Sequence, residues 1–302
     1  MNLEPSFWSL AEWPYDPTEI IAIVIPAVLY WLGVRYMRAH GLGRRLVWWR
    51  QASFALAIVV AFIALCSPID DWANSYLWAH MLQHELLAFV IAPLLLLGDP
   101  LLIIWRGVPL GGRRVIGRWF VQSGWLKRFF EAAERFLRLP AVSFLTFVVL
   151  YSVWHLPALY DLAEANDAVH AFEHFCFVFG GLIFWSQFIP SFPFKPNIGY
   201  VWQSAYFMLA MAWGFVLGWP FLLSTTPSYP YYADLARTPG MLDAITDQHI
   251  AGAIMDAFDT AIFISCAIIA VAFWLRDIER KSEAEEREYQ LQSQSVSTSA
   301  TP

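Results

Sequence analysis

Seven apolar segments of membrane-spanning length alternate with polar stretches along this chain of 302 residues. A helix needs about 20 predominantly apolar residues to cross the hydrocarbon core of a bilayer. Turn-forming sequence closes the third segment at Gly98-Asp99-Pro100. The pattern predicts an all-α fold, a polytopic membrane bundle of seven transmembrane helices. These helices are residues 19–36, 47–66, 77–97, 141–160, 168–189, 200–223 and 248–275.

The distribution of basic residues predicts how these helices are oriented. Cytoplasmic connections of membrane proteins carry an excess of Lys and Arg. With seven spans, only Arg237 of the 19 Lys and Arg residues falls on the side opposite to all the others. We therefore expect the N-terminus outside and the C-terminus in the cytoplasm, in a multi-pass membrane protein.

Two polar stretches complete the predicted organisation. The transmembrane domain, residues 1–275, includes a cytoplasmic connection, residues 106–138, that mixes Trp, Phe and Leu with basic residues. Such a mixture is typical of amphipathic helices that lie on the anionic inner leaflet. The cytoplasmic tail, residues 276–302, is rich in Ser, Gln and Glu, and we expect a short helical extension that becomes disordered.

Composition places the chain among integral membrane proteins. It is 58% hydrophobic and only 15% charged, whereas soluble domains are about a quarter charged. The 16 tryptophans suit anchoring at membrane interfaces. We expect the lipid bilayer and no nucleic acid as a partner, and no cleaved signal peptide, because no basic segment precedes an apolar one at the start. Cys66, Cys176 and Cys266 lie far apart, which favours apolar packing over a disulfide framework.

Two HxxxH pairs lie at the ends of apolar segments, His80-Met-Leu-Gln-His84 and His170-Ala-Phe-Glu-His174. A spacing of four residues places both imidazoles of a pair on one face of a helix. In the predicted topology both pairs fall at the outer face, and so do two further histidines, His155 and His249. Histidine is the commonest metal ligand, and ionisable groups within membranes are usually functional. The convergence of four helices predicts an outward-facing metal site.

Sulfur-containing side chains leave the identity of the metal open. Thioether and thiolate favour Cu(I), whereas imidazole accepts Cu, Zn or Fe. Met255 lies two turns into the last span and is the methionine nearest to the face of His249, while Cys66 ends the second span on the outer side. Met81, Met208 and Met211 also lie on these helices, although a single methionine is more often core filler.

Carboxylates extend along the last predicted span. His249, Asp256 and Asp259 are separated by seven and three residues and share a helix face, and Gly252 permits close helix approach. Asp259 lies about 18 Å along the axis from Asp247, at 1.5 Å per residue. The stripe fits either a proton or cation path that leads from the outer site, or hydrogen bonds between helices made by protonated acids.

Four motifs follow one another along the chain, and each contains one or two of these histidines. They are His80-Met-Leu-Gln-His84 continuing to Gly98-Asp99-Pro100, Trp154-His155-Leu156-Pro157, His170-Ala-Phe-Glu173-His174, and Asp247-Gln248-His249 continuing to Met255. Together they resemble the caa3-type cytochrome c oxidase assembly factors, the CtaG family of seven-span proteins, over approximately residues 52–275. The chain departs from the family pattern at Asp256, where tryptophan is expected, and at His249, where glutamine is more usual.

The resemblance implies a non-enzymatic protein of the bacterial inner membrane that helps to mature a haem–copper oxidase by supplying copper. Its partners would be an oxidase subunit or a periplasmic copper carrier. From the positions of the residues themselves, we expect His80, His84, His170 and His174 as primary ligands and His155, Asp247, His249 and Met255 as secondary ones. Asp161 and Glu173 would orient imidazoles, and Asp256 and Asp259 would line the path if the stripe of carboxylates conducts an ion.

Other classes of protein stay open as alternatives. HxxxH pairs also occur in di-metal membrane oxidoreductases, although those enzymes carry cytoplasmic HxxHH boxes, which this sequence lacks. Histidines that face each other across two helices would also suit haem binding. Asp256 and Asp259 are compatible with a metal-ion transporter, although the sequence has no visible internal repeat. A zincin is disfavoured because His80-Met-Leu-Gln-His84 lacks the glutamate of HExxH.

Overall fold

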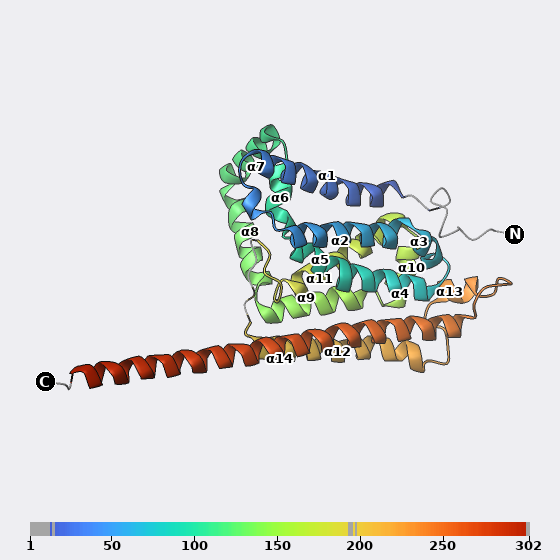
Figure 1. Cartoon of the computed structure of the whole chain (residues 1–302). Coiled ribbons are helices and arrows are strands. Elements are labelled where there is room, and N and C mark those ends of the chain that lie inside the picture. Colours follow the sequence, from blue (N-terminus) through green and yellow to red (C-terminus); the bar gives the residue numbers. More distant parts are fainter. Residues whose placement is uncertain (1–12, 14–15, 193–195, 197, 300–302) are drawn as a thin grey trace.

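The computed structural model describes residue 13, residues 16–192, residue 196 and residues 198–299. The longer helices run roughly parallel or antiparallel in one bundle (Figure 1), and the predicted all-α membrane bundle is confirmed. In chain order the elements are α1 (Pro17–Ala39), η2 (Gly43–Arg45), α2 (Trp48–Cys66), α3 (Pro68–Ala73), α4 (Leu77–Glu85), η3 (Leu86–Ile91), α5 (Ala92–Leu97), α6 (Pro100–Gly107), α7 (Leu110–Gln122), α8 (Gly124–Leu137), α9 (Pro140–Val153), α10 (Pro157–Glu164), α11 (Asp167–Trp185), α12 (Tyr200–Leu223), α13 (Pro230–Leu235) and α14 (Ala244–Ser299).

Within the described residues, six stretches of helix are long and apolar enough to cross a membrane, and one of them joins α4, η3 and α5 into a single run, Leu77–Leu97. A seventh candidate, α9, has 14 residues and reaches spanning length only together with α8, from which it is bent by 88°. The fourth predicted span, residues 141–160, is therefore too long. The helix ends at Val153, and Pro157 begins the separate helix α10 because proline lacks an amide hydrogen and cannot continue a preceding helix.

Helices α7 and α8 occupy the predicted cytoplasmic connection. They lie across the end of the bundle, with α8 roughly perpendicular to the spans (Figure 1). Large apolar side chains are exposed on both, including Trp119, Trp125, Phe129 and Phe136. Exposed aromatic residues among Lys and Arg are typical of helices at a membrane surface.

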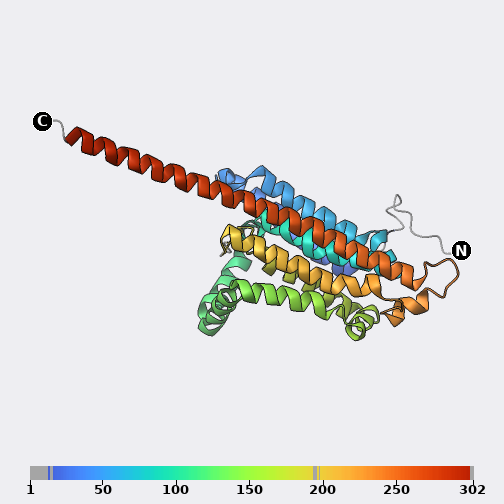
Figure 2. The same cartoon turned by 90° about the horizontal axis from the view of Figure 1, so that it is seen from below.

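Helix α14 continues well past the last predicted span. We expected the span to end at residue 275 and the tail to become disordered after a short extension. The structure instead carries one helix through Ser299, and this part projects beyond the bundle (Figure 1, Figure 2). Residues 276–299 contain no Gly or Pro. The ion pairs Asp277–Lys281 and Glu283–Arg287 also stabilise the helix at a spacing of four residues.

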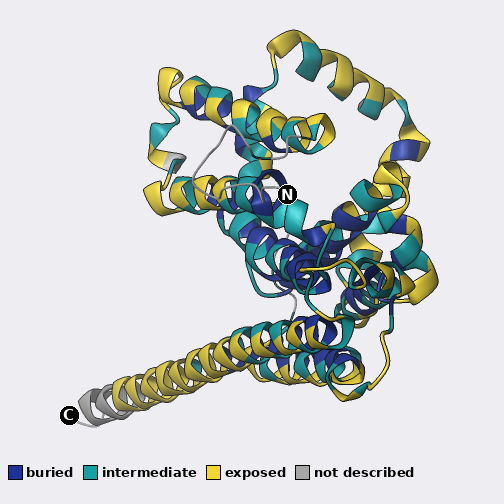
Figure 3. Cartoon of the chain, turned by 90° about the vertical axis from the view of Figure 1, so that its right-hand side faces the viewer, coloured by how far each residue is buried: buried dark blue, intermediate teal, exposed yellow. Residues whose placement is uncertain are grey.

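Glycines allow two pairs of helices to approach closely. A Cβ atom at Gly33 of α1 would lie 1.9 Å from the carbonyl oxygen of Ile103 in α6. A Cβ atom at Gly252 of α14 would lie 3.1 Å from the carbonyl oxygen of Gly218 in α12. Small residues at such crossings are the usual means of packing transmembrane helices. The buried residues gather where the spans face one another, whereas the projecting part of α14 is exposed (Figure 3).

Candidate metal centre

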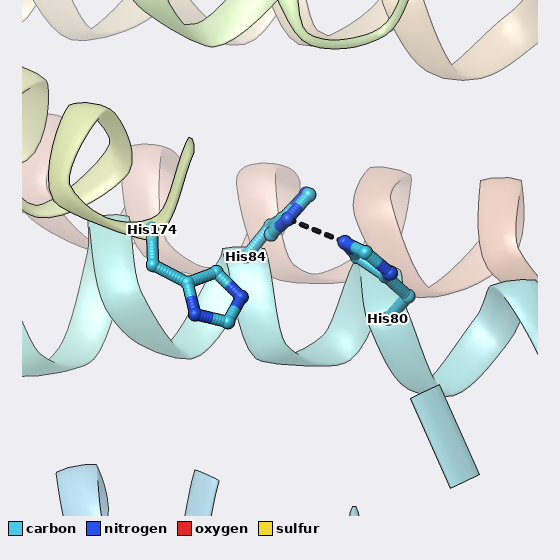
Figure 4. Close-up of side chains that lie close together, drawn as sticks. All are labelled: His80, His84 and His174. Atoms are coloured by element: carbon cyan, nitrogen blue, oxygen red, sulfur yellow. Dashed lines mark hydrogen bonds between the residues drawn. The ribbon is translucent and has the colours of Figure 1, made fainter. Parts of the chain in front are cut away.

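The structure brings the two HxxxH pairs together from α4 and α11. Nε2 of His80 lies 2.8 Å from Nε2 of His84. The ring centroids of His170 and His174 are 4.3 Å apart. Across the two helices, the ring of His80 lies 5.2 Å from that of His170, and the ring of His84 lies 5.9 Å from that of His174. Figure 4 shows His80, His84 and His174 turned toward a common point.

Local sequence fixes where each pair lies on its helix. Helix α11 begins after Asn166, whose side chain accepts hydrogen bonds from the amides of Ala168 and Val169. Helix α4 begins at Leu77 and passes directly after Glu85 into the π-helical turn η3. A π-helical turn inside a longer helix is frequently found at a functional site, since it redirects the side chains that follow.

Two glutamates accompany the histidines. Glu173 is fully buried, and its carboxylate oxygens lie 3.8 Å from Nε2 of His80 and 3.5 Å from Nε2 of His84. Oε1 of Glu164 lies 2.7 Å from Nδ1 of His80. The hydroxyl oxygen of Tyr232 lies 2.6 Å from the carbonyl oxygen of Ala73 and 3.2 Å from Oε1 of Glu164, two acceptors that share its single proton. His80 is therefore held on its Nδ1 side, which leaves Nε2 directed toward the cluster.

Electrostatics around Glu164 follow from the same arrangement. Burial raises the pKa of Glu164, while the imidazole of His170 and the hydroxyl of Tyr232 oppose that rise. Burial and the charge of Glu164 together raise the pKa of Tyr232, so that its hydroxyl keeps the proton that it donates.

The donor atoms fit a cation. Buried nitrogens of four histidines have no hydrogen-bond partner in the described part of the chain: Nδ1 of His84 and Nε2 of His155, His170 and His174. Buried polar atoms in proteins nearly always have partners, so such a concentration points to a ligand. Donor atoms of His80, His84 and His174 lie within 4.8 Å of one another, and so do those of His80, His170 and Glu173. A tetrahedral ion with bonds of about 2.0–2.1 Å holds its ligands roughly 3.3 Å apart, so modest side-chain movements would suffice.

His155 and Asp161, predicted as accessory residues, lie at different distances from the cluster. The ring of His155 is 6.4 Å from that of His84, and its Nδ1 lies 2.7 Å from the carbonyl oxygen of Tyr151. The carboxylate of Asp161 faces the backbone of Tyr231. His155 borders the cluster, whereas no contact joins Asp161 to an imidazole in the described part of the chain.

The predicted ligands of the last span are engaged elsewhere. Asp247 accepts hydrogen bonds from the amides of Leu77 at 2.8 Å and Trp78 at 3.0 Å, so it caps α4. Nε2 of His249 lies 3.1 Å from the carbonyl oxygen of Ser224. Met255 is buried in the main hydrophobic core. The structure therefore assigns Asp247 to positioning α4, and it does not bring these three residues into the histidine cluster.

Deeper in the bundle, Asp256 and Asp259 of α14 pack against α12. A Cβ atom at Gly214 would lie 1.9 Å from Oδ2 of Asp259, and one at Gly218 would lie 2.3 Å from Oδ1 of Asp256. Glu85 belongs to the same region, and its Oε1 accepts a hydrogen bond of 2.5 Å from the hydroxyl of Tyr151. The glycines leave the space that the two aspartates fill.

Three residues of the site were not predicted as such: Glu164, Tyr232 and Glu19. Glu164 and Tyr232 reach His80 from α10 and α13, two short helices that cover the cluster. Oε1 of Glu19, in the first turn of α1, lies 3.4 Å from Nδ1 of His174. The sequence offered one signal for these residues, which was their position. Glu19 starts a predicted span and the other two lie in connections, and the predicted topology places all three on the outer side.

A cavity of about 440 Å³ between α1, α2 and α11 adjoins the cluster. Its wall is apolar over most of its length, and Glu19 and His174 line one end. His80 and His84 are 1% exposed, whereas His174 is 6% exposed and forms part of the cavity wall. Among the described residues, His174 thus connects the histidine cluster with this cavity.

These features define a polytopic helical membrane protein with a buried His–Glu cluster suited to a metal ion. Residues 28–277 match the sequence profile of the cytochrome c oxidase caa3 assembly factors, Caa3_CtaG, and the chain belongs to this family. It is also 24% identical, over 283 residues, to the uncharacterized proteins Mb0105 of Mycobacterium bovis and MT0111 of Mycobacterium tuberculosis. The match covers 92% of this chain and 42% of each relative, so the chain spans less than half of their length. No solved structure matches the chain significantly.

Proposed function

We propose that this protein binds a copper ion at the His–Glu cluster and supplies it to a haem–copper oxidase during assembly. The observation that carries the proposal is the group of three buried imidazoles, His80, His84 and His174, with donor atoms within 4.8 Å of one another. Imidazole is a good ligand for copper, and membership of the caa3 assembly-factor family supplies the link to an oxidase. The direct partner would be an oxidase subunit or a periplasmic copper carrier.

Binding and release require no bond-breaking chemistry, so the proposed role is not enzymatic. His80, His84, His170 and His174 would hold the ion, with Glu173 as a carboxylate ligand. Glu164 would orient His80, because a carboxylate that accepts from one ring nitrogen leaves the other nitrogen free for a metal. A buried cluster of this kind protects the ion from water and from competing ligands until a partner reaches it.

The test is copper analysis of the purified full-length chain next to the variant His80→Ala/His84→Ala. The wild type should carry stoichiometric copper and the double variant none. His40→Ala is the matched control, since His40 bonds only within its own segment, at the carbonyl of Tyr36. Unchanged copper in a folded double variant would overturn the proposal. An optical spectrum of the same preparation tests the haem alternative, because haem gives a Soret band and copper does not.

Delivery needs a second measurement. In cells that lack this protein, the wild type should restore the copper content of the haem–copper oxidase, and the double variant should not. Full restoration by a double variant that is present in the membrane at wild-type level would show that the cluster is not the source of the copper.

A further inference from the structure

The His–Glu cluster contains two groups of potential ligands that share one residue. One group is His80, His84 and His174, and the other is His80, His170 and Glu173. In each group the donor atoms lie within 4.8 Å of one another. Among the described residues, His84 and His170 do not occur in the same group. The five side chains therefore surround two positions rather than one.

The shared residue can serve only one of these positions at a time. Nδ1 of His80 lies 2.7 Å from Glu164 and 3.2 Å from the hydroxyl of Tyr232, so it is engaged outside the cluster. Nε2 is the nitrogen that faces both His84, at 2.8 Å, and Glu173, at 3.8 Å. A neutral imidazole nitrogen has a single lone pair and binds one metal ion. Simultaneous occupation of both positions would leave one ion with two of its three ligands.

The two positions lie at different depths. His84 follows His80 by four residues on α4, and His174 follows His170 by four residues on α11. Four residues correspond to about 6 Å along a helix axis. His170 is half-buried, while His84 and His174 are buried, and His174 lines the cavity next to α1. The position with His170 and Glu173 is thus nearer the helix starts, and the other is deeper.

We propose that the cluster offers one metal ion two overlapping coordination positions, and that the ion passes between them by exchanging ligands around Nε2 of His80. The outer position uses His170 and Glu173, and the inner position uses His84 and His174. This inference rests on the proposed function, since it describes how the same ion is held. It accounts for a histidine that belongs to both groups and for a carboxylate, Glu173, whose oxygens lie 3.8 Å from Nε2 of His80 and 3.5 Å from Nε2 of His84, between the two positions.

The donor sets of the two positions differ, with three imidazoles in the inner position and two imidazoles and a carboxylate in the outer one. Copper accepts both imidazole and mixed nitrogen and oxygen ligands, so the ion can pass between the positions without a change of oxidation state. Ligand exchange around a shared nitrogen lets an ion move without ever leaving protein ligands. The ion would then progress from the more exposed position to the one that adjoins the cavity at Glu19 and His174.

The test compares single and double variants of the full-length chain, with copper alone as the probe. Cu(I) affinity is measured by competition with a chromophoric chelator. We expect His84→Ala and His170→Ala each to weaken binding by less than about 10-fold, since the other position remains. We expect the double variant His84→Ala/His170→Ala, and likewise the single variant His80→Ala, to weaken Cu(I) binding by more than about 100-fold. Such a loss exceeds the usual cost of disturbing an accessory residue. His40→Ala is the control, because His40 lies at the end of α1, outside both groups, with its Nδ1 2.8 Å from the carbonyl oxygen of Tyr36.

Distinct outcomes separate this inference from the proposed function. No copper on the wild type would refute both. Copper binding that each single variant abolishes would refute only the two positions, since it indicates one site that needs every ligand. Glu173→Gln preserves the shape of the side chain, so this variant should fold even if an alanine variant does not. It should retain Cu(I), and it should alter the electron paramagnetic resonance spectrum of bound Cu(II). Two tightly bound ions per wild-type chain would also contradict the shared position.

Discussion

Oε1 of Glu164 lies 2.7 Å from Nδ1 of His80, and both side chains are 1% exposed. This contact joins α10 to α4 across 84 residues of sequence. A carboxylate that accepts from Nδ1–H fixes the tautomer and the ring orientation of a histidine, and it strengthens the opposite nitrogen as a ligand. The pair therefore determines how Nε2 of His80 is presented to both ligand groups.

Replacement of Glu164 should lower copper affinity without removing any direct ligand. Loss of an oriented partner of this kind typically costs about 10- to 100-fold in metal affinity. We expect Glu164→Ala to show that loss and Glu164→Gln a smaller one, because the amide oxygen still accepts from Nδ1–H but carries no charge. Chelator competition measures both, and the circular dichroism spectrum reports whether each variant folds. Equal affinity of all three proteins would show that Glu164 does not orient His80.

Asp247 should behave as a helix cap and not as a metal ligand. Its carboxylate accepts from the amides of Leu77 and Trp78, and its side chain is 4% exposed. Removal of a capping acceptor costs about 0.5–2 kcal/mol. We expect Asp247→Ala to lower the thermal stability in detergent by that order, and Asp247→Asn, which keeps one acceptor, to lower it less.

Copper content distinguishes the cap from a ligand. Asp247→Asn should retain wild-type copper stoichiometry, with His84→Ala/His170→Ala as the comparison that loses it. A folded Asp247→Asn variant that binds no copper would show that Asp247 is a metal ligand.

The periodicity of apolar residues and the distribution of charge predicted much of this architecture, because both can be read from residues that are close together in the sequence. A spacing of four residues places His80 beside His84 whatever surrounds the helix, and the convergence of α4 with α11 followed from where each span starts. The contacts of His80 with Glu164 and Tyr232 depend on how α10 and α13 fold over the bundle. No local pattern encodes such a contact, so these partners could not be predicted.

The same reasoning explains why Asp247 and His249 of α14 do not join the histidine cluster. Asp247 and His249 share the predicted outer end with the histidine pairs, but a common depth does not determine which way a side chain points. Asp247 turns to the free amides of α4, which need an acceptor wherever a helix starts inside a protein. His249 turns to the carbonyl of Ser224.

Labelling of introduced cysteines should reveal the predicted orientation in the membrane. Ser282 lies on the exposed part of α14, and Thr238 is exposed between α13 and α14. We expect a membrane-impermeant maleimide added to intact spheroplasts to label Thr238→Cys and not Ser282→Cys, and to label both after lysis. The unchanged chain is the control, because it measures the background labelling of its own three cysteines, the buried Cys66 and Cys176 and the half-buried Cys266. The reverse pattern would place the His–Glu cluster at the cytoplasmic face.

The close packing of Gly214 against Asp259 should appear as energetic coupling between the two positions. A Cβ atom at Gly214 would lie 1.9 Å from Oδ2 of Asp259, a side chain that is 1% exposed. We expect Gly214→Ala to destabilise the protein by about 1–3 kcal/mol, the usual cost of overpacking. Asp259→Ala removes the clashing atoms, so the double variant should be more stable than the sum of the single effects predicts.

A double-mutant cycle measured by unfolding in detergent quantifies this coupling. Gly117→Ala is the matched control, since no atom lies within 4 Å of its added Cβ and a helical Gly→Ala change there gains up to about 1 kcal/mol. Independent sites add to within about 0.5 kcal/mol. Additive behaviour of Gly214→Ala and Asp259→Ala would mean that α12 and α14 approach each other less closely than the glycines permit. A coupling above 1 kcal/mol would instead establish that Gly214 is kept small by the carboxylate that it faces.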